Sequence, residues 1–400
     1  MPGARTTSVP GAGPAAVAER ARFCVALVFV LNGTVFASWV SRLPAVRAAL
    51  DLSTGELGLL LLCLAVGSVL GLPTSGPLVA RLGPARAVLA GATVVAAGLL
   101  LLALGLAAAQ VPLSGVGLLL VGLGIATWDV AMNVEAADVE RRLSRTLMPR
   151  FHAGFSLGTV AGALLGAGAA ATGVDVQLQL AATAVVALVA VAVCVRAFLP
   201  VEVAADADAP LRIGQAWAEP RTVLIGLLVL CFAFVEGTAN DWLAIALVDG
   251  HGRSEAVGAL GFAVFVAAMT AARTVGGSLL ARWGRPAVLR ASAGLAVAGL
   301  LLVVLGSVLP LVLAGALLWG AGAALGFPVG MSAAADDPRG AAVRVSVVSS
   351  IGYTAFLAGP PLVGLLAEPE RLGVLRALLV VLVALLVGAG LAGRVAPLRG

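Results

Sequence analysis

Apolar runs of about 20 residues recur along the whole chain, and short polar turns separate them. A helix needs about 20 mostly apolar residues to cross the hydrocarbon core of a bilayer, so each run predicts one transmembrane helix. The chain contains twelve of these runs, two of which nearly fuse at Leu309 and Pro310. The predicted spans are 22–41, 55–79, 86–109, 112–136, 151–172, 177–198, 222–247, 255–280, 287–307, 310–332, 341–366 and 372–394.

One short motif occurs twice, half a chain length apart. Residues 76–83 read GPLVARLG and residues 277–284 read GSLLARWG, and each copy stands where an apolar run ends in an arginine-bearing turn. Two further pairs follow in the same order, namely GLG at 122–124 with GAG at 320–322 and GF at 154–155 with GY at 352–353. A duplicated block of membrane helices is a common plan for transporters.

The duplication predicts an all-α membrane protein with twelve transmembrane helices in two pseudo-symmetric six-helix bundles. The bundles are expected over residues 22–199 and 221–396, with a polar cytoplasmic linker at 200–220. Residues 1–21 are rich in Ala, Gly and Pro and are expected to be disordered, and 397–400 form a short cytoplasmic tail.

The composition agrees with a bilayer as the solvent of this chain. It is 61% hydrophobic and only 11% charged, whereas a soluble domain carries about 25% charged residues. The net charge of +5 does not indicate a nucleic-acid partner, because the arginines are spread over short turns. The four cysteines fall inside apolar runs, so we expect no disulfide, metal site or cofactor.

The distribution of arginine predicts the orientation in the membrane. All 25 basic residues are arginine, and with the N-terminus in the cytoplasm 19 of them fall on the cytoplasmic side and five in outer loops. This bias follows the positive-inside rule, and an odd number of spans would scramble it. We therefore expect a multi-pass protein of the cytoplasmic membrane with both termini in the cytoplasm.

A twelve-span chain in two such halves, with a Gly-x-Leu-x-x-Arg-x-Gly turn after spans two and eight, resembles the major facilitator superfamily over nearly its whole length. Three further strings are similar to a poorly characterised bacterial inner-membrane branch near the fucose-permease-like members: WDVAMNVE at 128–135, FHAGFSLG at 151–158, and Glu236-Gly237 to Asp241-Trp242. The resemblance implies the superfamily fold and an alternating-access cycle in which the two halves rock.

The two turns depart from the superfamily pattern at one position. The family turn has an acid just before the arginine, and this chain has alanine there in both copies. We therefore expect a differently weighted inner gate, in which Glu135 or Asp138 is the partner of Arg81 or Arg86. The predicted gating residues are Gly76, Arg81, Gly83, Gly277, Arg282, Gly284, Glu135 and Asp138.

Ionisable side chains inside hydrocarbon are costly and are therefore functional candidates. Asp129 stands 12 residues before Arg141, about 18 Å along a helix and near mid-membrane, and the resemblance places its span on the transport cavity. Apolar surroundings favour the neutral form of a carboxyl group, which suits proton uptake. A structural acid paired with an arginine is the alternative. Asn133 lies one turn further along.

Span seven carries a second polar group. Glu236 lies 15 residues beyond Arg221, about 22 Å along the helix, and Asn240 follows on the same face. A carboxylate and an amide on one face suit a polyol, a sugar or a similar solute, and a helix–helix hydrogen bond is the alternative. Asp241 lies nearer the outer surface and is expected at a gate or interface.

Arg273 stands nine residues before Arg282, about 13 Å deep, which is too deep for comfortable snorkelling. We expect it to pair with Asp129 or Glu236. A pair with Asp129 would join the two halves, and protonation would release it. Asn32 adds a polar group in span one.

Several aromatic residues and one histidine have two open interpretations. The candidates for lining the cavity, with core packing as the alternative, are Trp39, Trp128, Trp242, Trp319 and Tyr353. His152 is either a proton relay or an interfacial packing residue.

Glycines recur every four residues in span five, at Gly154, Gly158, Gly162 and Gly166. The resemblance implies that span five contacts span eight across the two halves. The stripe is then either a sliding surface for the rocking motion or a static packing surface. Gly322, Gly326 and Gly330 repeat the pattern in span ten, where Pro328 is expected to bend the helix.

These features predict a monomeric secondary active transporter for a small organic solute. Proton-coupled symport of a sugar-like or other polar solute is the main interpretation, and proton antiport that exports drugs or metabolites is the alternative. No phosphate-cradling loop indicates direct use of ATP. We expect no enzyme activity, because the two histidines have no spacing that suits a metal or a nucleophile–base set. A solute sensor on a transporter fold is the third interpretation.

Overall fold

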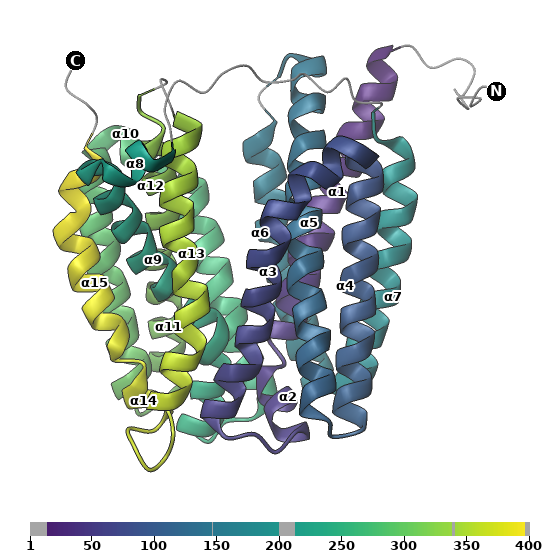
Figure 1. Cartoon of the computed structure of the whole chain (residues 1–400). Helices are drawn as coiled ribbons and strands as arrows, with labels where there is room; N and C mark the ends of the chain where they lie inside the picture. The colour runs from purple at the N-terminus through teal and green to yellow at the C-terminus, as the bar shows by residue number, and fades with distance from the viewer. Residues whose placement is uncertain (1–13, 146, 200–212, 338–340, 397–400) are drawn as a thin grey trace.

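The computed structural model describes residues 14–145, 147–199, 213–337 and 341–396, and every regular element in these ranges is a helix. The helices form two bundles that stand side by side (Figure 1). The first and the last of the described residues lie at the same end of the molecule, the upper end in Figure 1. We call it the termini end and the opposite one the far end. The predicted all-α membrane fold is confirmed.

The first bundle contains six long helices. A short helix follows the first of them at the far end, and a 3₁₀ turn extends the last. The elements are α1 (Pro14–Val40), α2 (Leu43–Ala49), α3 (Thr54–Leu82), α4 (Pro84–Ala107), α5 (Val111–Leu143), α6 (Met148–Ala171), α7 (Val176–Cys194) and η1 (Val195–Ala197). A capping box starts α3, because Ser53 accepts a hydrogen bond from the Glu56 N–H and Glu56 accepts one from the Ser53 N–H.

The second bundle repeats this plan with more breaks. The elements are α8 (Ile213–Ala218), α9 (Pro220–Ile245), η2 (Ala246–Gly250), α10 (Glu255–Leu305), α11 (Leu309–Ala323), α12 (Gly326–Ala334), α13 (Ala341–Leu366), α14 (Val374–Ala377), α15 (Val380–Leu391) and η3 (Ala392–Val395). The element η2 is a π-helical turn that ends α9.

The 51 residues of α10 are two spans joined at a sharp turn. A straight helix of that length would measure about 76 Å, far more than a bilayer needs. Gly284 divides it with φ 75° and ψ 158°, values that only glycine adopts without strain. Gly83 has φ 76° and ψ 159° at the corresponding turn between α3 and α4. The repeated motif therefore makes the same backbone turn in both halves, and the eleven apolar helical segments of the described chain provide twelve spans.

Some boundaries differ from the sequence prediction. The first helix already begins at Pro14, within the stretch expected to be disordered, because alanine favours helix and proline is tolerated in a first turn. Part of the expected linker is the helix α8. Residues 1–13, 200–212 and 397–400 of the expected terminus, linker and tail lie outside the described residues.

The glycine stripe of α6 packs against α1 of the same bundle. A Cβ on Gly162 would stand 3.0 Å from the Ser38 backbone nitrogen, and one on Gly154 would stand 3.4 Å from the Ala26 carbonyl oxygen. Gly158 and Gly166 face the same helix. Of the two interpretations of this stripe, the one in which it slides on span eight is therefore wrong, and static packing describes the contact. Helix α6 also contacts α10 of the second bundle.

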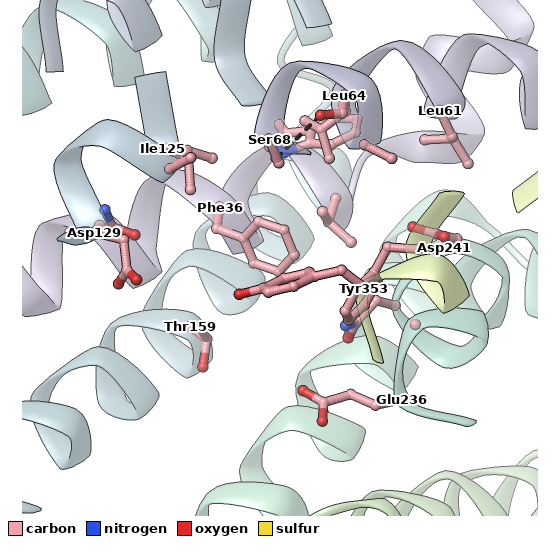
Figure 2. A pocket seen from close by; sticks show the side chains of 18 of the residues that line it. Phe36, Leu61, Leu64, Ser68, Ile125, Asp129, Thr159, Glu236, Asp241 and Tyr353 are labelled. Carbon is pink, nitrogen blue, oxygen red and sulfur yellow. Dashed lines mark hydrogen bonds between the residues drawn. The ribbon is translucent and has the colours of Figure 1, made fainter. Parts of the chain in front are cut away.

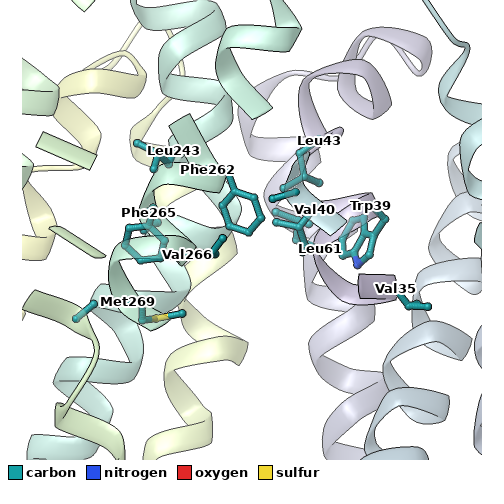
Figure 3. Packing of buried hydrophobic residues seen from close by; sticks show 14 of the residues in the cluster. Val35, Trp39, Val40, Leu43, Leu61, Leu243, Phe262, Phe265, Val266 and Met269 are labelled. Carbon is teal, nitrogen blue, oxygen red and sulfur yellow. The ribbon is translucent and has the colours of Figure 1, made fainter. Parts of the chain in front are cut away.

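The two bundles are sealed together at the far end. Helix α3 crosses α13 there, and α2 contacts α9 and α10. Figure 3 shows Phe262 of α10 pointing toward Val40 and Leu43 of the first bundle, and all three side chains are buried. The bundles diverge toward the termini end (Figure 1).

Candidate functional site

A cavity of about 330 Å³ lies between the two bundles. Helices α1, α3, α5 and α6 of the first bundle and α9, α10 and α13 of the second line it (Figure 2). Its volume is at the small end of the range of roughly 300–1,000 Å³ that ligand pockets occupy. The cavity is therefore large enough for a small organic molecule.

The cavity collects most of the polar side chains that the sequence singles out. The predicted pathway residues among its lining are Asn32, Trp39, Asp129, Glu236, Asn240, Asp241, Arg273 and Tyr353. Asn133 lies beside the cavity, where its Nδ2 donates to the Asp129 carbonyl oxygen at 2.9 Å. Trp319 is fully buried elsewhere and packs edge-to-face on Phe265.

Arg273 pairs with Glu236 and holds a broken helix at the same time. Its Nη2 donates to both Glu236 carboxylate oxygens, at 3.0 and 3.1 Å, and its Nε donates to the Ala324 carbonyl oxygen at 3.1 Å. That carbonyl lies between α11 and α12. Its usual helical donor would be the N–H of residue 328, and Pro328 has none. Pro328 thus breaks span ten where the sequence predicts a bend. The Arg273 guanidinium donates the hydrogen bond that the Ala324 carbonyl oxygen would otherwise lack.

The ion pair of Arg273 lies within the second bundle. Of the two predicted partners, Glu236 is the one within reach, so the pair that would join the halves through Asp129 does not occur in this conformation. Asp129 instead contacts the Asn133 amide, with 3.4 Å between Nδ2 and Oδ1. Tyr353 extends from α13 toward the Asp129 side of the cavity (Figure 2).

Neither acid at the inner end of span four pairs with a turn arginine. Asp138 forms ion pairs with Arg141 and Arg142, one turn further along its own helix. Glu135 is fully buried, and its Oε1 accepts the Leu199 N–H at 2.6 Å. The predicted pairing of these acids with Arg81 or Arg86 is therefore wrong. Asp138 has closer partners one turn along its own helix, and Glu135 has a closer partner in the Leu199 backbone N–H.

A second cavity continues from the first toward the termini end. Both are lined by Phe155 and Arg273, and the second is also lined by Arg150, His152 and Arg285. The ring of His152 packs edge-to-face on Phe29. The pathway between the bundles is thus hollow from its middle toward the termini end, while the far end is packed.

Polar contacts between the bundles add to the packing at the far end. Arg47 pairs with Asp249, and the Gly55 N–H donates to Glu368 at 2.7 Å. Arg42 stands 3.6 Å from Glu255, and burial lowers the pKa of Arg42 while Glu255 opposes that shift. No local pattern in the sequence indicates these contacts, because their partners lie some 200 or 300 residues apart in the chain.

Comparison with known proteins agrees with this architecture. The Major Facilitator Superfamily matches residues 23–245. An uncharacterized transporter of Sinorhizobium fredii is 36% identical over 86% of this chain and 90% of its own length. Among solved structures, a mutant of the nucleoside transporter NupG has a TM-score of 0.77 at 14% identity, covering 94% of this chain and 98% of that one. The E. coli fucose:proton symporter FucP has a TM-score of 0.60 at 15% identity, covering 93% and 99%.

Proposed function

The chain belongs to the major facilitator superfamily and is a secondary transporter, and we propose that it moves a small polar organic solute by proton-coupled symport. It works as a monomer in the cytoplasmic membrane, with both termini in the cytoplasm. The arginine distribution supports this orientation. FucP has the same fold and is a fucose:proton symporter, which supports this mode of coupling.

The observation that carries the proposal is one cavity, between the halves, that contains carboxylates from both. Asp129 comes from the first half, and Glu236 and Asp241 come from the second. Asp129 takes up the proton, because its described contacts include no ion pair that would hold it charged. Glu236, Asn240 and Arg273 hold the solute.

The described conformation corresponds to a transporter open toward the cytoplasm. The cavity continues toward the termini end, and the far end is sealed by α3 on α13 and by inter-bundle ion pairs. In the transport cycle the far end opens and the termini end closes. The two turns at Gly83 and Gly284, with Arg81 and Arg282 beside them, form the inner gate that then closes.

The test is solute-driven proton movement in proteoliposomes. Purified protein is first screened by thermal shift against hexoses, polyols and nucleosides, because a specific ligand stabilises the folded state. The strongest ligand is then added outside vesicles that enclose a pH reporter. We expect saturable acidification inside, its loss in Asp129→Asn, and its retention in Asp51→Asn, which changes an exposed loop acid. Solute uptake without proton movement would refute the coupling.

Proton antiport that exports drugs or metabolites is the second candidate. It shares the need for an acid in the pathway, and the largely apolar lining of the cavity favours it for a hydrophobic solute. The same vesicles distinguish the two, because an antiported solute moves protons in the opposite direction. A solute that binds and does not move would indicate a sensor.

A further inference from the structure

The side chains that line the central cavity have more negative than positive charge. The ionisable groups among its described lining residues are the carboxylates of Asp129, Glu236 and Asp241, the guanidinium of Arg273 and the phenol of Tyr353. If all three acids are charged, the cavity carries two net negative charges between mostly apolar walls. Such an imbalance is unfavourable unless a cation or a proton compensates it.

The guanidinium in the cavity is already paired with a carboxylate. Arg273 binds both oxygens of Glu236 and also the Ala324 carbonyl, so it contributes a neutral pair rather than a free positive charge. An anionic solute would also meet the carboxylates of Asp129 and Asp241, which this pair leaves uncompensated. The cavity therefore selects against anions.

Asp241 is the carboxylate that this arrangement leaves without a role. It is half-buried in the cavity wall beside Asn240, and within the described part of the chain it has no hydrogen-bond or ion-pair partner. Figure 2 shows it on the opposite side of the cavity from Asp129. The lining of the cavity also includes the aromatic rings of Phe36 and Phe356. Aromatic faces in a cavity stabilise an organic ammonium group through cation–π interaction.

The opposite wall supplies hydrogen-bond donors that also lack partners. The Asn32 side chain is 2% exposed and its Nδ2 has no partner, and the Trp39 ring, which is 1% exposed, has a free Nε1–H. Both side chains come from α1 and line the cavity. A buried donor without an acceptor is unfavourable, so each is suited to a hydroxyl or carbonyl oxygen of a bound solute.

We propose that the solute is a hydroxylated molecule with a protonated amine, and that Asp241 binds the amine while Asn32 and Trp39 bind its oxygens. This inference rests on the proposed transport function and names the class of solute for the same cavity. Asp241 is then the residue that determines specificity, and Asp129 remains available for the proton. A neutral sugar leaves Asp241 uncompensated, and an anion is repelled by it.

The test compares solutes of nearly equal shape and different charge. The full-length protein in nanodiscs at pH 7 is titrated with glucamine, sorbitol and gluconate, and with glucosamine, glucose and glucuronate, and the thermal unfolding temperature is followed. We expect each amine to bind at least about tenfold more tightly than its neutral counterpart, the gain typical of a charged hydrogen bond. Asp241→Asn should abolish this preference, Asp241→Glu should keep part of it, and Asp51→Asn should keep it whole.

Several results would overturn the proposal. These are equal binding of amines and neutral solutes, preference for the anions, absence of stabilisation by both amines, and an amine preference that survives in Asp241→Asn. Stabilisation by sodium that Asp241→Asn removes would assign the carboxylate to ion coupling instead. The proton-movement assay tests the proposed transport function separately. A neutral sugar that drives proton movement would refute only the proposal that the solute is an amine. An amine that binds without proton movement would refute only the proposal of proton coupling.

Discussion

A single methyl group added at the far end should shift the protein toward its outward-open state. Gly58 lies where α3 of the first bundle crosses α13 of the second. A Cβ at Gly58 would stand 2.5 Å from the Pro360 carbonyl oxygen and 3.1 Å from the Pro361 Cα. Gly364 faces the same crossing, where its Cβ would stand 3.2 Å from the Gly58 Cα. Because the obstacles are backbone atoms, Gly58→Ala can be accommodated only if the two helices separate.

The size of the shift follows from this geometry. Overpacking a tight contact costs about 1–3 kcal/mol, and this contact exists only while the far end is closed. A bias of that size changes the ratio of open to closed molecules by roughly 5- to 150-fold. The higher helix propensity of alanine, about 1 kcal/mol over glycine, is present in both states and cancels.

Distances between spin labels measure this shift. On a background without the native cysteines, one pair of labels at Ala48 and Arg253 spans the far end, and a second pair at Arg81 and Arg282 spans the termini end. All four positions are exposed. In Gly58→Ala we expect the far-end distances to lengthen and the termini-end distances to shorten, because a rocking motion couples the two ends.

Gly168→Ala is the matched control. Gly168 lies in α6, and a Cβ added there would have no atom within 4 Å, so both distance distributions should match those of the wild type. Unchanged distances in Gly58→Ala would refute the reasoning, since they would mean that the crossing relaxes locally and does not hold the far end closed. Lengthening at both ends would also refute it, because the bundles would then have separated without rocking.

Three further predictions concern contacts away from the cavity. Removing the side chain of Arg47 or Asp249 should raise the ratio of open to closed molecules at the far end about two- to fivefold, because a partly exposed ion pair is worth up to about 1 kcal/mol. The double variant should add little to this change in the same spin-label experiment. Gly284→Ala should lower the free energy of unfolding by about 1–3 kcal/mol, because its φ of 75° with ψ of 158° is strained for alanine; an unchanged melting temperature would contradict this. The hydrogen bond from Arg344 lowers the pKa of Glu219 below its usual 4.5, so Glu219→Gln should have a lower melting temperature than the wild type at pH 7. This difference in melting temperature should fade as the pH falls below about 4.5, where Glu219 loses its charge. A difference that grows at low pH would contradict the pairing.

The sequence determined most of the architecture, because a bilayer permits few solutions. Runs of about 20 apolar residues must be helical to satisfy their backbone in hydrocarbon, which yields the spans by length alone. The repeated motif ending at Gly83 and Gly284 indicated two equivalent halves, and the structure shows the same glycine conformation at both turns. The rarity of charge in the spans also singled out Asp129, Glu236 and Arg273, three of the residues that the cavity brings together.

Partner choice was decided only by tertiary structure. Arg273 had two possible partners at similar depth, and the packing of α9 on α10 selected Glu236. The glycine stripe of α6 identified a close contact, yet a stripe has no information about which helix it meets, and the fold supplies α1. The contacts that seal the far end join residues hundreds of positions apart, so no local pattern could reveal them. Helix formation depends on neighbours in the chain, whereas the open or closed state of the pathway depends on how two finished bundles meet.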